Sequence, residues 1–188
     1  HDIRTPKTVA ITHSETVEES FKKLKTDFPV ILKSSTGTQT GIGVVVVESL
    51  RSLTALVQMT LLYNKYLPII IQEYIKTDWD IRVLVCEGKV IAAMKRIVMS
   101  DDVRSNASMG ADTESLELTE LERTESIRIA EEFGGRITGV DLIPAKDREN
   151  ELPYCLEINA NPGLNGIEDI TKGSPTKTIL EKYKDRSI

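Results

Sequence analysis

The sequence predicts an α+β protein built from two lobes, and three observations lead to this class. The first part of the chain reads strand–helix–strand–strand–helix. The second part holds two pairs of strands with one helix between them. An apolar strand pattern over residues 67–75 ends in a polar pair, and we expect the lobes to meet near residues 72–77.

The composition of the 188 residues is that of a soluble globular protein and argues against several other classes. Apolar residues make up 40% and charged residues 28% of the chain, which are ordinary values. The longest apolar runs, LPIII and VVVV, are too short to cross a bilayer, and no signal peptide pattern occurs. The net charge of -5 argues against a general nucleic-acid binder. Cys86 and Cys155 lie in predicted strands, so we expect buried free thiols in a reducing cytoplasm.

Three strands and two helices are expected in the first part. TVAIT (8–12) predicts a short strand, and a helix follows from Ser14 or Thr16, where Thr16 and Glu19 have the spacing of a capping box. PVILK (29–33) and GVVVVE (43–48) predict a hairpin with a long tip. Apolar residues at helical spacing mark the two helices, namely Val17, Phe21 and Leu24 in the first and Leu50, Leu53, Val57 and Leu61 in the second.

The second part begins with strands and ends with a helix. LPIIIQEYI (67–75) predicts a strand, and residues 80–98 predict two strands around a turn at Glu87–Gly88. Residues 100–117 are polar and predict a long loop, and a helix is expected from Thr119 to Phe133, where Gly134 and Gly135 end it. The remaining expectations are strands at 138–145 and 152–160, a solvated tip KDRENE between them, a loop at 161–166 and a helix at 175–185.

The tip of the first hairpin has the composition of a phosphate-binding loop. Glycine lets backbone N–H groups approach an anion closely, and Lys33 adds a positive charge where the first strand ends. The alternative is a flexible hairpin tip with a surface lysine. The loop matches neither a P-loop, nor a dinucleotide fingerprint, nor a kinase loop. The residues that suit the task are Gly37, Thr38, Thr40, Gly41 and Gly43.

Three oxygen-bearing side chains predict a magnesium site. Glu157 and Asn159 lie two apart on one strand and therefore share a face, and Asp141 lies on the strand before it. Carboxylate and amide oxygens are ligands that Mg²⁺ accepts beside water and phosphate. Lone acids on strands usually face solvent, but Asp141 and Glu157 stand in runs that otherwise read as buried, where an unpaired carboxylate is costly.

Basic residues lie between the loop and the acids. Arg82 and Asp80 are two apart on a strand, and an ordinary salt bridge between them is one interpretation. Lys95 and Arg96 are adjacent and face opposite sides of their strand. Each basic residue alone reads as a surface charge. Together with Lys33, these arginines and Arg104 could neutralise a triphosphate.

At this point the sequence resembles the RimK-like ATP-grasp ligases. The matching segments occur in the family's order over nearly the whole chain: PVILK, GTQTGIGV, QEYI, DIR, RSN, GVD, LEINANPGL and NGIE. The resemblance implies an ATP-grasp fold with an N-terminal lobe at 1–75 and a C-terminal lobe at 76–188. It also implies that the family's N-terminal domain lies upstream, which agrees with a chain that begins at His1 without methionine. The glycine-rich loop is one residue longer than the family pattern, and Lys95 stands where that pattern has an acid.

The family's functional residues carry over by position, as implications of the resemblance. Asp141, Glu157 and Asn159 would hold two Mg²⁺ ions, with Mn²⁺ as an alternative ion. Asp80 would contact the nucleotide at its ribose, and the catalytic arginines would be Arg82, Arg96 and Arg104. The remaining ATP contacts would come from Lys33, the loop Gly37, Thr38, Gln39, Thr40, Gly41 and Gly43, the hinge Gln72, Glu73, Tyr74 and Ile75, and the triplet Arg104, Ser105 and Asn106.

The activity implied is an ATP-dependent carboxylate–amine ligase that works through an acyl phosphate. The amine would be glutamate or another amino acid, and the acceptor a protein C-terminus, such as that of a ribosomal protein, or a small molecule. The resemblance also implies a homo-oligomer when full length. From composition, charge and cysteines we expect a cytoplasmic enzyme with no membrane or nucleic-acid partner. Two alternatives stay open: an ATP-binding module without catalysis, and a ribosome- or protein-binding domain without ATP.

Overall fold

The chain folds into two compact units. The computed structural model describes residues 2–11, 13, 16–34, 43–97, 112–171 and 173–184. Of the described residues, the N-terminal unit holds 6–76, and the C-terminal unit holds 2–5 together with those from 77 onward. Residues 2–5 differ from the sequence-based boundary because Arg4 binds within the second unit. Its Nη1 donates to the Leu152 carbonyl (2.6 Å), and its own carbonyl accepts from the Cys155 N–H (2.8 Å).

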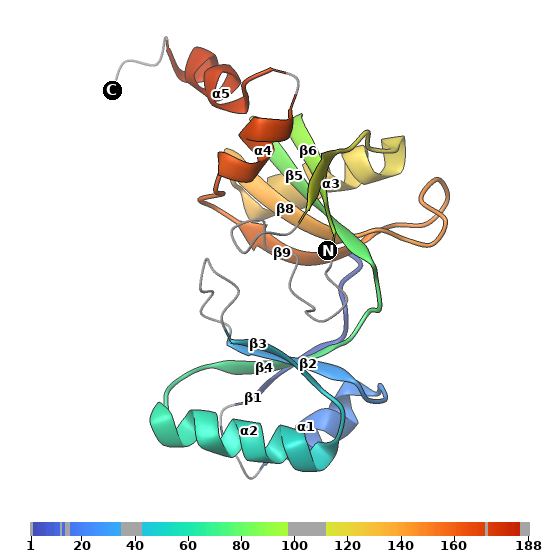
Figure 1. The fold of residues 1–188 in the computed structure, drawn as a ribbon, viewed down its shortest axis with the longest axis vertical. Coiled ribbons are helices and arrows are strands. Elements are labelled where there is room, and N and C mark those ends of the chain that lie inside the picture. The colour runs from blue at the N-terminus through green and yellow to red at the C-terminus, as the bar shows by residue number, and fades with distance from the viewer. Residues whose placement is uncertain are drawn as a thin grey trace. The chain divides into compact units, whose positions relative to one another are not determined.

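The N-terminal unit is a four-stranded antiparallel sheet with two helices on one face (Figure 1). The strands are ordered β1-β4-β2-β3, and β2 pairs with β3 as the predicted hairpin. The order of elements confirms the strand–helix–strand–strand–helix prediction. The elements are β1 Thr8–Ile11, α1 Val17–Leu24, β2 Val30–Ser34, β3 Val44–Val47, α2 Leu50–Tyr63 and β4 Ile69–Glu73.

The core of this unit follows the period of two along its strands. Leu32 and Ile71, which are register partners, are buried in one cluster with Leu53 and Val57 of α2. Each such side chain contributes about 1.5–3 kcal/mol by leaving water. Because successive side chains alternate between faces, Lys33 lies on the face that α1 and α2 do not cover.

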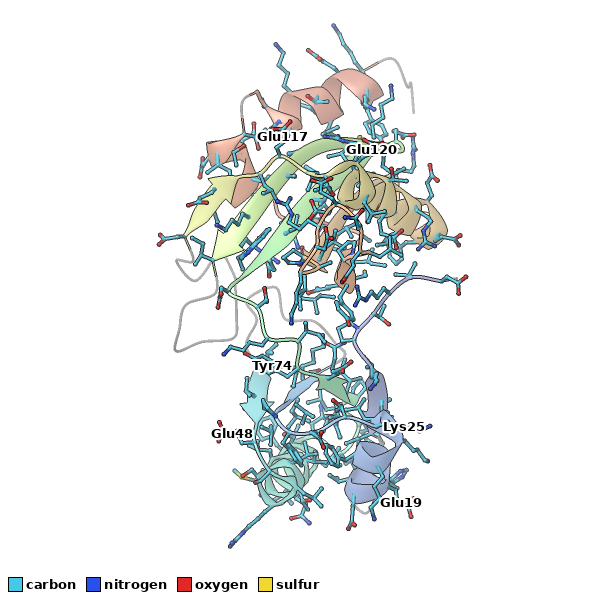
Figure 2. The ribbon with its side chains drawn as sticks, turned by 90° about the vertical axis from the view of Figure 1, so that its right-hand side faces the viewer. Glu19, Lys25, Glu48, Tyr74, Glu117 and Glu120 are labelled. Atoms are coloured by element: carbon cyan, nitrogen blue, oxygen red, sulfur yellow. The ribbon has the colours of Figure 1, made fainter. Side chains whose placement is uncertain are left out.

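The start of α1 differs from the prediction. Thr16 is the residue before the helix, but its side chain accepts no bond from the helix backbone. Its hydroxyl donates instead to the His13 carbonyl (2.8 Å), and Glu19 is exposed on α1 (Figure 2). The predicted capping box is therefore wrong, although the helix forms.

The C-terminal unit is a five-stranded antiparallel sheet in the order β7-β6-β5-β8-β9, with helices on both faces (Figure 1). Ile129 of α3 packs with Ile81 and Val140 on one face. Ile167 of α4 packs with Leu84 and Met94 on the other. The elements are β5 Trp79–Cys86, β6 Lys89–Ile97, β7 Thr113–Ser115, α3 Glu120–Phe133, β8 Ile137–Ile143, β9 Tyr154–Asn159, α4 Asn165–Ile170 and α5 Pro175–Tyr183.

Two of these elements were not predicted. β7 lies inside the stretch read as a loop, and α4 begins inside the loop expected at 161–166. β7 has three residues, TES, and forms by pairing with β6 through Met94, Lys95 and Arg96. α4 has six residues and is held by Ile167 against the sheet. Both are too short for a periodic pattern, so tertiary contacts rather than local sequence define them.

Both cysteines are buried free thiols, as predicted. Burial raises the pKa of the Cys155 thiol to about 11. Among the described residues, no helix is both long enough and apolar enough to span a bilayer.

The start of α3 is fixed by a capping box that extends into a buried ion pair. The Glu122 N–H donates to Thr119 Oγ1 (3.2 Å), and the Thr119 N–H donates to Glu122 Oε2 (3.0 Å). Glu122 is 1% exposed, and both its oxygens accept from Arg148 at 2.7 Å. The tip KDRENE, expected to be solvated, therefore anchors to α3 through Arg148.

Thr119→Ala should lower the stability of the C-terminal unit by about 1–2 kcal/mol, because a helix N–H loses its acceptor. Trp79 is the only tryptophan and lies in this unit, so its fluorescence during urea unfolding reports the change. Thr124→Ala is the matched control on the same helix, since Thr124 is exposed and makes one bond of 3.4 Å. Equal effects of the two variants would show that the cap has no special role.

Candidate functional site

The register of three neighbouring strands places four charged residues side by side. On β5, Asp80 and Arg82 are two apart and share one face of the sheet. Asp80 is the register partner of Arg96 on β6, and Arg82 is the register partner of Asp141 on β8. The face is the one that carries Leu84 and Met94, opposite to α3.

These four side chains form a chain of alternating charge. Arg96 Nε and Nη2 donate to the two oxygens of Asp80 at 2.6 and 2.9 Å. Arg82 Nη1 lies 2.7 Å from both oxygens of Asp141. Arg96 Nη2 is also 3.3 Å from Asp141 Oδ2, which links the two pairs. The sequence had suggested a salt bridge between Asp80 and Arg82, but each of them binds a residue of a neighbouring strand.

The central residues of this charge chain are buried, so each charge is stabilised by the opposite charges beside it. Asp80, Arg96 and Asp141 are 4%, 6% and 5% exposed. Burial lowers the pKa of Arg96, but the carboxylates of Asp141 and Asp80 outweigh it and raise that pKa above its ordinary value. Removing one partner of such a buried pair leaves an uncompensated charge, which is strongly destabilising.

The other two predicted metal ligands lie on the edge strand β9. Glu157 is the register partner of Asp141, and Asn159 is the register partner of Gly139. With its amide oriented to satisfy both neighbours, Asn159 donates to Glu157 Oε1 (3.0 Å) and accepts from Arg82 Nη1 (3.1 Å). Glu157 is exposed, which corrects the expectation that both acids are buried. The sheet thus joins Asp141, Glu157 and Asn159 in one hydrogen-bonded group around Arg82.

This group has the donor chemistry of a magnesium site. Mg²⁺ is usually held by one or two carboxylates, with water and substrate phosphates completing the shell. Asp141 and Glu157 supply two carboxylates and Asn159 an amide oxygen. Among the described residues, no group of three or more His, Cys, Asp or Glu side chains could hold a metal. The cationic nitrogen of Arg82 already lies between oxygens of Asp141 and Asn159, which shows that a positive charge fits there.

Gly139 explains why this arrangement fits beneath the loop that follows β9. A Cβ at Gly139 would lie 2.9 Å from Pro162 Cβ and 3.4 Å from both Arg82 Cζ and Nε. A side chain would therefore push either Arg82 or the loop away. In the GVD motif, only the aspartate was predicted to be functional. The glycine two residues earlier, on the same face, was a signal that this prediction missed.

Two of the nucleotide residues predicted in the N-terminal unit, Lys33 and Gln72, lie on one sheet face. Lys33 is half-buried, and Ile31, two residues before it, points to the same helix-free face. Gln72 is the register partner of Ile31 and therefore lies on that face as well. Gln72 is buried, and its Nε2 donates to Thr8 Oγ1 (2.8 Å), so its side-chain amide is hydrogen-bonded to the neighbouring strand β1.

The rest of the predicted hinge follows directly after Gln72. The Glu73 N–H donates to the Lys7 carbonyl (2.8 Å), and the Glu73 carboxylate accepts from the Lys7 N–H (3.2 Å). Tyr74 and Ile75 are half-buried in the segment after β4, where Figure 2 labels Tyr74. Gly43 precedes β3 with a φ of +95°, a conformation that favours glycine.

Several predicted ATP contacts lie outside the described residues. Their roles therefore stay predictions. They are Gly37, Thr38, Gln39, Thr40 and Gly41 of the loop, and Arg104, Ser105 and Asn106 of the RSN motif.

Known proteins with similar sequences belong to the same family that the sequence motifs indicate. A family model described as RimK-like ATP-grasp domain matches residues 1–182. A probable alpha-L-glutamate ligase 2 of Shewanella sp. (strain MR-4) is 40% identical over 164 residues, which cover 85% of this chain and 52% of the relative. A probable alpha-L-glutamate ligase of Marinomonas sp. (strain MWYL1) is 36% identical over 97% of this chain and 58% of its own length. The chain therefore spans about half the length of the curated relatives it matches.

Solved structures share the fold at lower identity. The ATP-grasp ligase PsnB, complexed with a minimal precursor, superposes with a TM-score of 0.71 at 21% identity and covers 99% of this chain and 56% of PsnB. D-alanine–D-alanine ligase from Bacillus anthracis gives a TM-score of 0.66, also at 21% identity, over 97% of this chain and 58% of that enzyme. At these identities the likeness concerns the fold.

Arg96→Ala should destabilise the C-terminal unit by about 3–5 kcal/mol, because the buried carboxylates of Asp80 and Asp141 lose a shared cationic partner. Lys95→Ala is the control, because Lys95 is the adjacent cation but faces the other side of β6. It pairs with exposed Glu114 at 3.3 Å. Its loss should therefore lower the stability by less than about 1 kcal/mol. Urea unfolding followed by Trp79 fluorescence measures both, with far-UV circular dichroism to allow for the closeness of Lys95 to Trp79. An exposed ion pair contributes at most about 1 kcal/mol. A loss no larger than this for Arg96→Ala would contradict the account of the charge chain.

Proposed function

The chain belongs to the RimK-like ATP-grasp family, and we propose that it is the ATP- and metal-binding part of a ligase that joins a carboxylate to an amine. The family match over residues 1–182 and the fold neighbours confirm the α+β class and the ATP-grasp fold expected from the sequence. Relatives with up to 40% identity are named as probable alpha-L-glutamate ligases, which supports the ligase class. Because the chain spans about half their length, the activity proposed is that of a longer protein.

One observation carries this proposal beyond family membership. Asp141, Glu157 and Asn159 occupy facing positions of β8 and β9 and share a hydrogen-bonded group with Arg82. A sheet built only for stability gains little from a buried charge chain, since apolar residues of similar volume are often as stable. Oxygen donors beside a positive group are instead what phosphoryl transfer requires.

We assign the roles as follows. Asp141, Glu157 and Asn159 would hold Mg²⁺, in two ions as the family resemblance implies, with Mn²⁺ as the alternative. When bound, Mg²⁺ would neutralise charge on the transferred phosphoryl group and orient the phosphates. Lys33, the loop Gly37 to Gly43 and the triplet Arg104, Ser105 and Asn106 would bind the phosphates, and the hinge Gln72 to Ile75 would hold the adenine.

For two residues we propose roles other than those that the resemblance implies. Asp80 was expected at the ribose, but it is 4% exposed and both its oxygens accept from Arg96. We therefore propose that Asp80 holds Arg96, and that Arg96 is a positioning residue for Asp141 rather than a catalytic one. Arg82 and Arg104 keep the proposed catalytic role.

The proposed chemistry needs positioning rather than a protein nucleophile. A carboxylate attacks the γ-phosphorus of ATP, which gives an acyl phosphate and ADP. An amine then attacks the acyl carbon, phosphate leaves, and the amine loses a proton. The cationic donors would stabilise the charge that moves onto the phosphoryl oxygens, and the fixed strands would keep the reactants in line.

The relatives also support a substrate class. Their names point to glutamate as the amine, and we propose an amino acid as one substrate. The acceptor is proposed to be a protein C-terminus, such as that of a ribosomal protein, or a small carboxylate. We further propose a homo-oligomer for the longer protein and, from the two reduced buried thiols, a cytoplasmic location.

The chain should gain thermal stability from nucleotide and metal together. Ligand that binds only the native state stabilises by mass action, about 2.7 kcal/mol at one hundred times its Kd. Differential scanning fluorimetry with Mg²⁺ and a non-hydrolysable ATP analogue measures the shift. A double variant, Glu157→Ala with Asn159→Ala, should fold and show little shift. A shift of equal size without Mg²⁺, or in the double variant, would remove these residues from the metal site.

The longer protein should release ADP over repeated turnovers only when an amino acid and a carboxylate acceptor are both present, because without the amine the reaction stops at the acyl phosphate. Asp141→Asn should lower kcat by about 100-fold or more, because a charged ligand of the phosphoryl-transfer site is lost. A coupled ADP assay with glutamate measures this. Binding without ADP release under any acceptor screened would favour the alternative, an ATP-binding module without catalysis.

A further inference from the structure

Arg82 occupies the point on which the predicted metal ligands converge. Its Nη1 is 2.7 Å from Asp141 Oδ1, 2.7 Å from Asp141 Oδ2 and 3.1 Å from the amide oxygen of Asn159. Asn159 in turn donates to Glu157 Oε1 at 3.0 Å. One guanidinium nitrogen thus contacts two of the three proposed ligands and is one residue removed from the third.

A magnesium ion held by the same oxygens needs the same space. Mg²⁺ lies about 2.0–2.1 Å from its ligand oxygens and keeps a strict octahedral shell. A donor nitrogen 2.7 Å from both oxygens of Asp141 would lie inside or against that shell, and its positive charge would repel the ion. Arg82 and the ion therefore compete for Asp141 and Asn159.

We propose that Arg82 is a tethered counter-cation that holds the metal ligands together and yields its place when Mg²⁺ binds; the metal site itself rests on the function proposed above. Arg82 sets the affinity for the ion, since every binding event must displace an existing ion pair. The displaced guanidinium then has free donors close to a metal-bound anion. When the ion binds, Arg82 thereby exchanges its hydrogen bonds to the Asp141 carboxylate for hydrogen bonds to phosphate.

The surroundings of Arg82 suit such a movement. Asp141 keeps a second cation at Arg96 Nη2 (3.3 Å), so it is not left unpaired when Arg82 moves. Gly139 has no side chain, and a Cβ there would come within 3.4 Å of Arg82 Cζ and Nε. Arg82 is also the most exposed of the four charged residues, at 15% of its side chain, against 7% or less for Arg96, Asp141 and Asp80. The buried pair is thus the fixed part and Arg82 the movable one.

Binding of Mn²⁺ alone, without nucleotide, tests the competition. Electron paramagnetic resonance counts free Mn²⁺ in titrations of the wild-type chain and of Arg82→Gln. The proposal predicts that Arg82→Gln binds Mn²⁺ on the order of ten-fold more tightly, because the competing charge is gone. Arg82→Lys, which keeps the charge, should stay nearer to wild type. Equal or weaker binding by a folded Arg82→Gln variant would overturn the proposal.

The matched control is Arg136→Gln. It removes the same charge from the same unit. Arg136 forms an exposed pair with Glu87 just before β8, at the end of the strand where Ile137 is the register partner of Cys86. Arg136→Gln should leave Mn²⁺ affinity within about two-fold of wild type, since long-range charge is screened. An equal gain in both variants would contradict a local competition.

A second measurement uses the wild-type chain and does not depend on any variant folding. The side-chain nitrogen resonances of Arg82 report whether its Nη1 protons are held by a carboxylate. Saturating Mg²⁺ should shift the Arg82 signals and speed their rotation, while Arg96 signals stay in place. Unchanged Arg82 signals at saturating Mg²⁺ would overturn the proposal. Neither experiment contains nucleotide, so a failure of the ligase proposal would leave these results standing and would be recognised separately.

Discussion

The buried charge chain from Asp80 through Arg96 and Asp141 to Arg82 is the constraint on which the C-terminal unit depends. Its members come from β5, β6 and β8, and they meet only in the observed register. A slip of one residue would turn each side chain to the other face, into the apolar cluster around Ile81, and leave charges unpaired there. The chain therefore makes the register of the sheet a condition for stability as well as for the site.

The two faces of the sheet have different roles, one in stability and one in the site. The face toward α3 is apolar and holds the fold together through residues such as Val83 and Ile129. The other face is apolar beneath α4 and α5, where Leu84 packs with Ile167, and becomes charged two residues away at Arg82. The edge strand β9 then adds Glu157 in a solvent-exposed position, where an ion and phosphates could reach it. Stability and chemistry thus share β5 and β8 through the alternation of side chains.

Much of this could be predicted from the sequence, and the misses have physical reasons. Strands such as 29–33 and the ligand motif GVD with LEIN followed from period and residue type, because both are local signals. β7 and α4 have three and six residues and exist through contacts with β6 and the sheet, so no local pattern showed them. The partner of Arg82 depended on which strand lies beside β5, a fact that spacing along the chain does not contain. Gly139 was missed for the same reason, since only the fold brings Pro162 and Arg82 against it.

The most direct measurement of the central claim is paramagnetic broadening of backbone amide signals by Mn²⁺ in the presence of an ATP analogue. The account predicts that signals of Asp141, Glu157 and Asn159 broaden first, and that those around the Glu87–Gly88 turn, at the far end of β5, stay sharp. Broadening centred instead on the acidic hairpin tip near Asp147, with β8 and β9 unaffected, would contradict a metal site built around the charge chain.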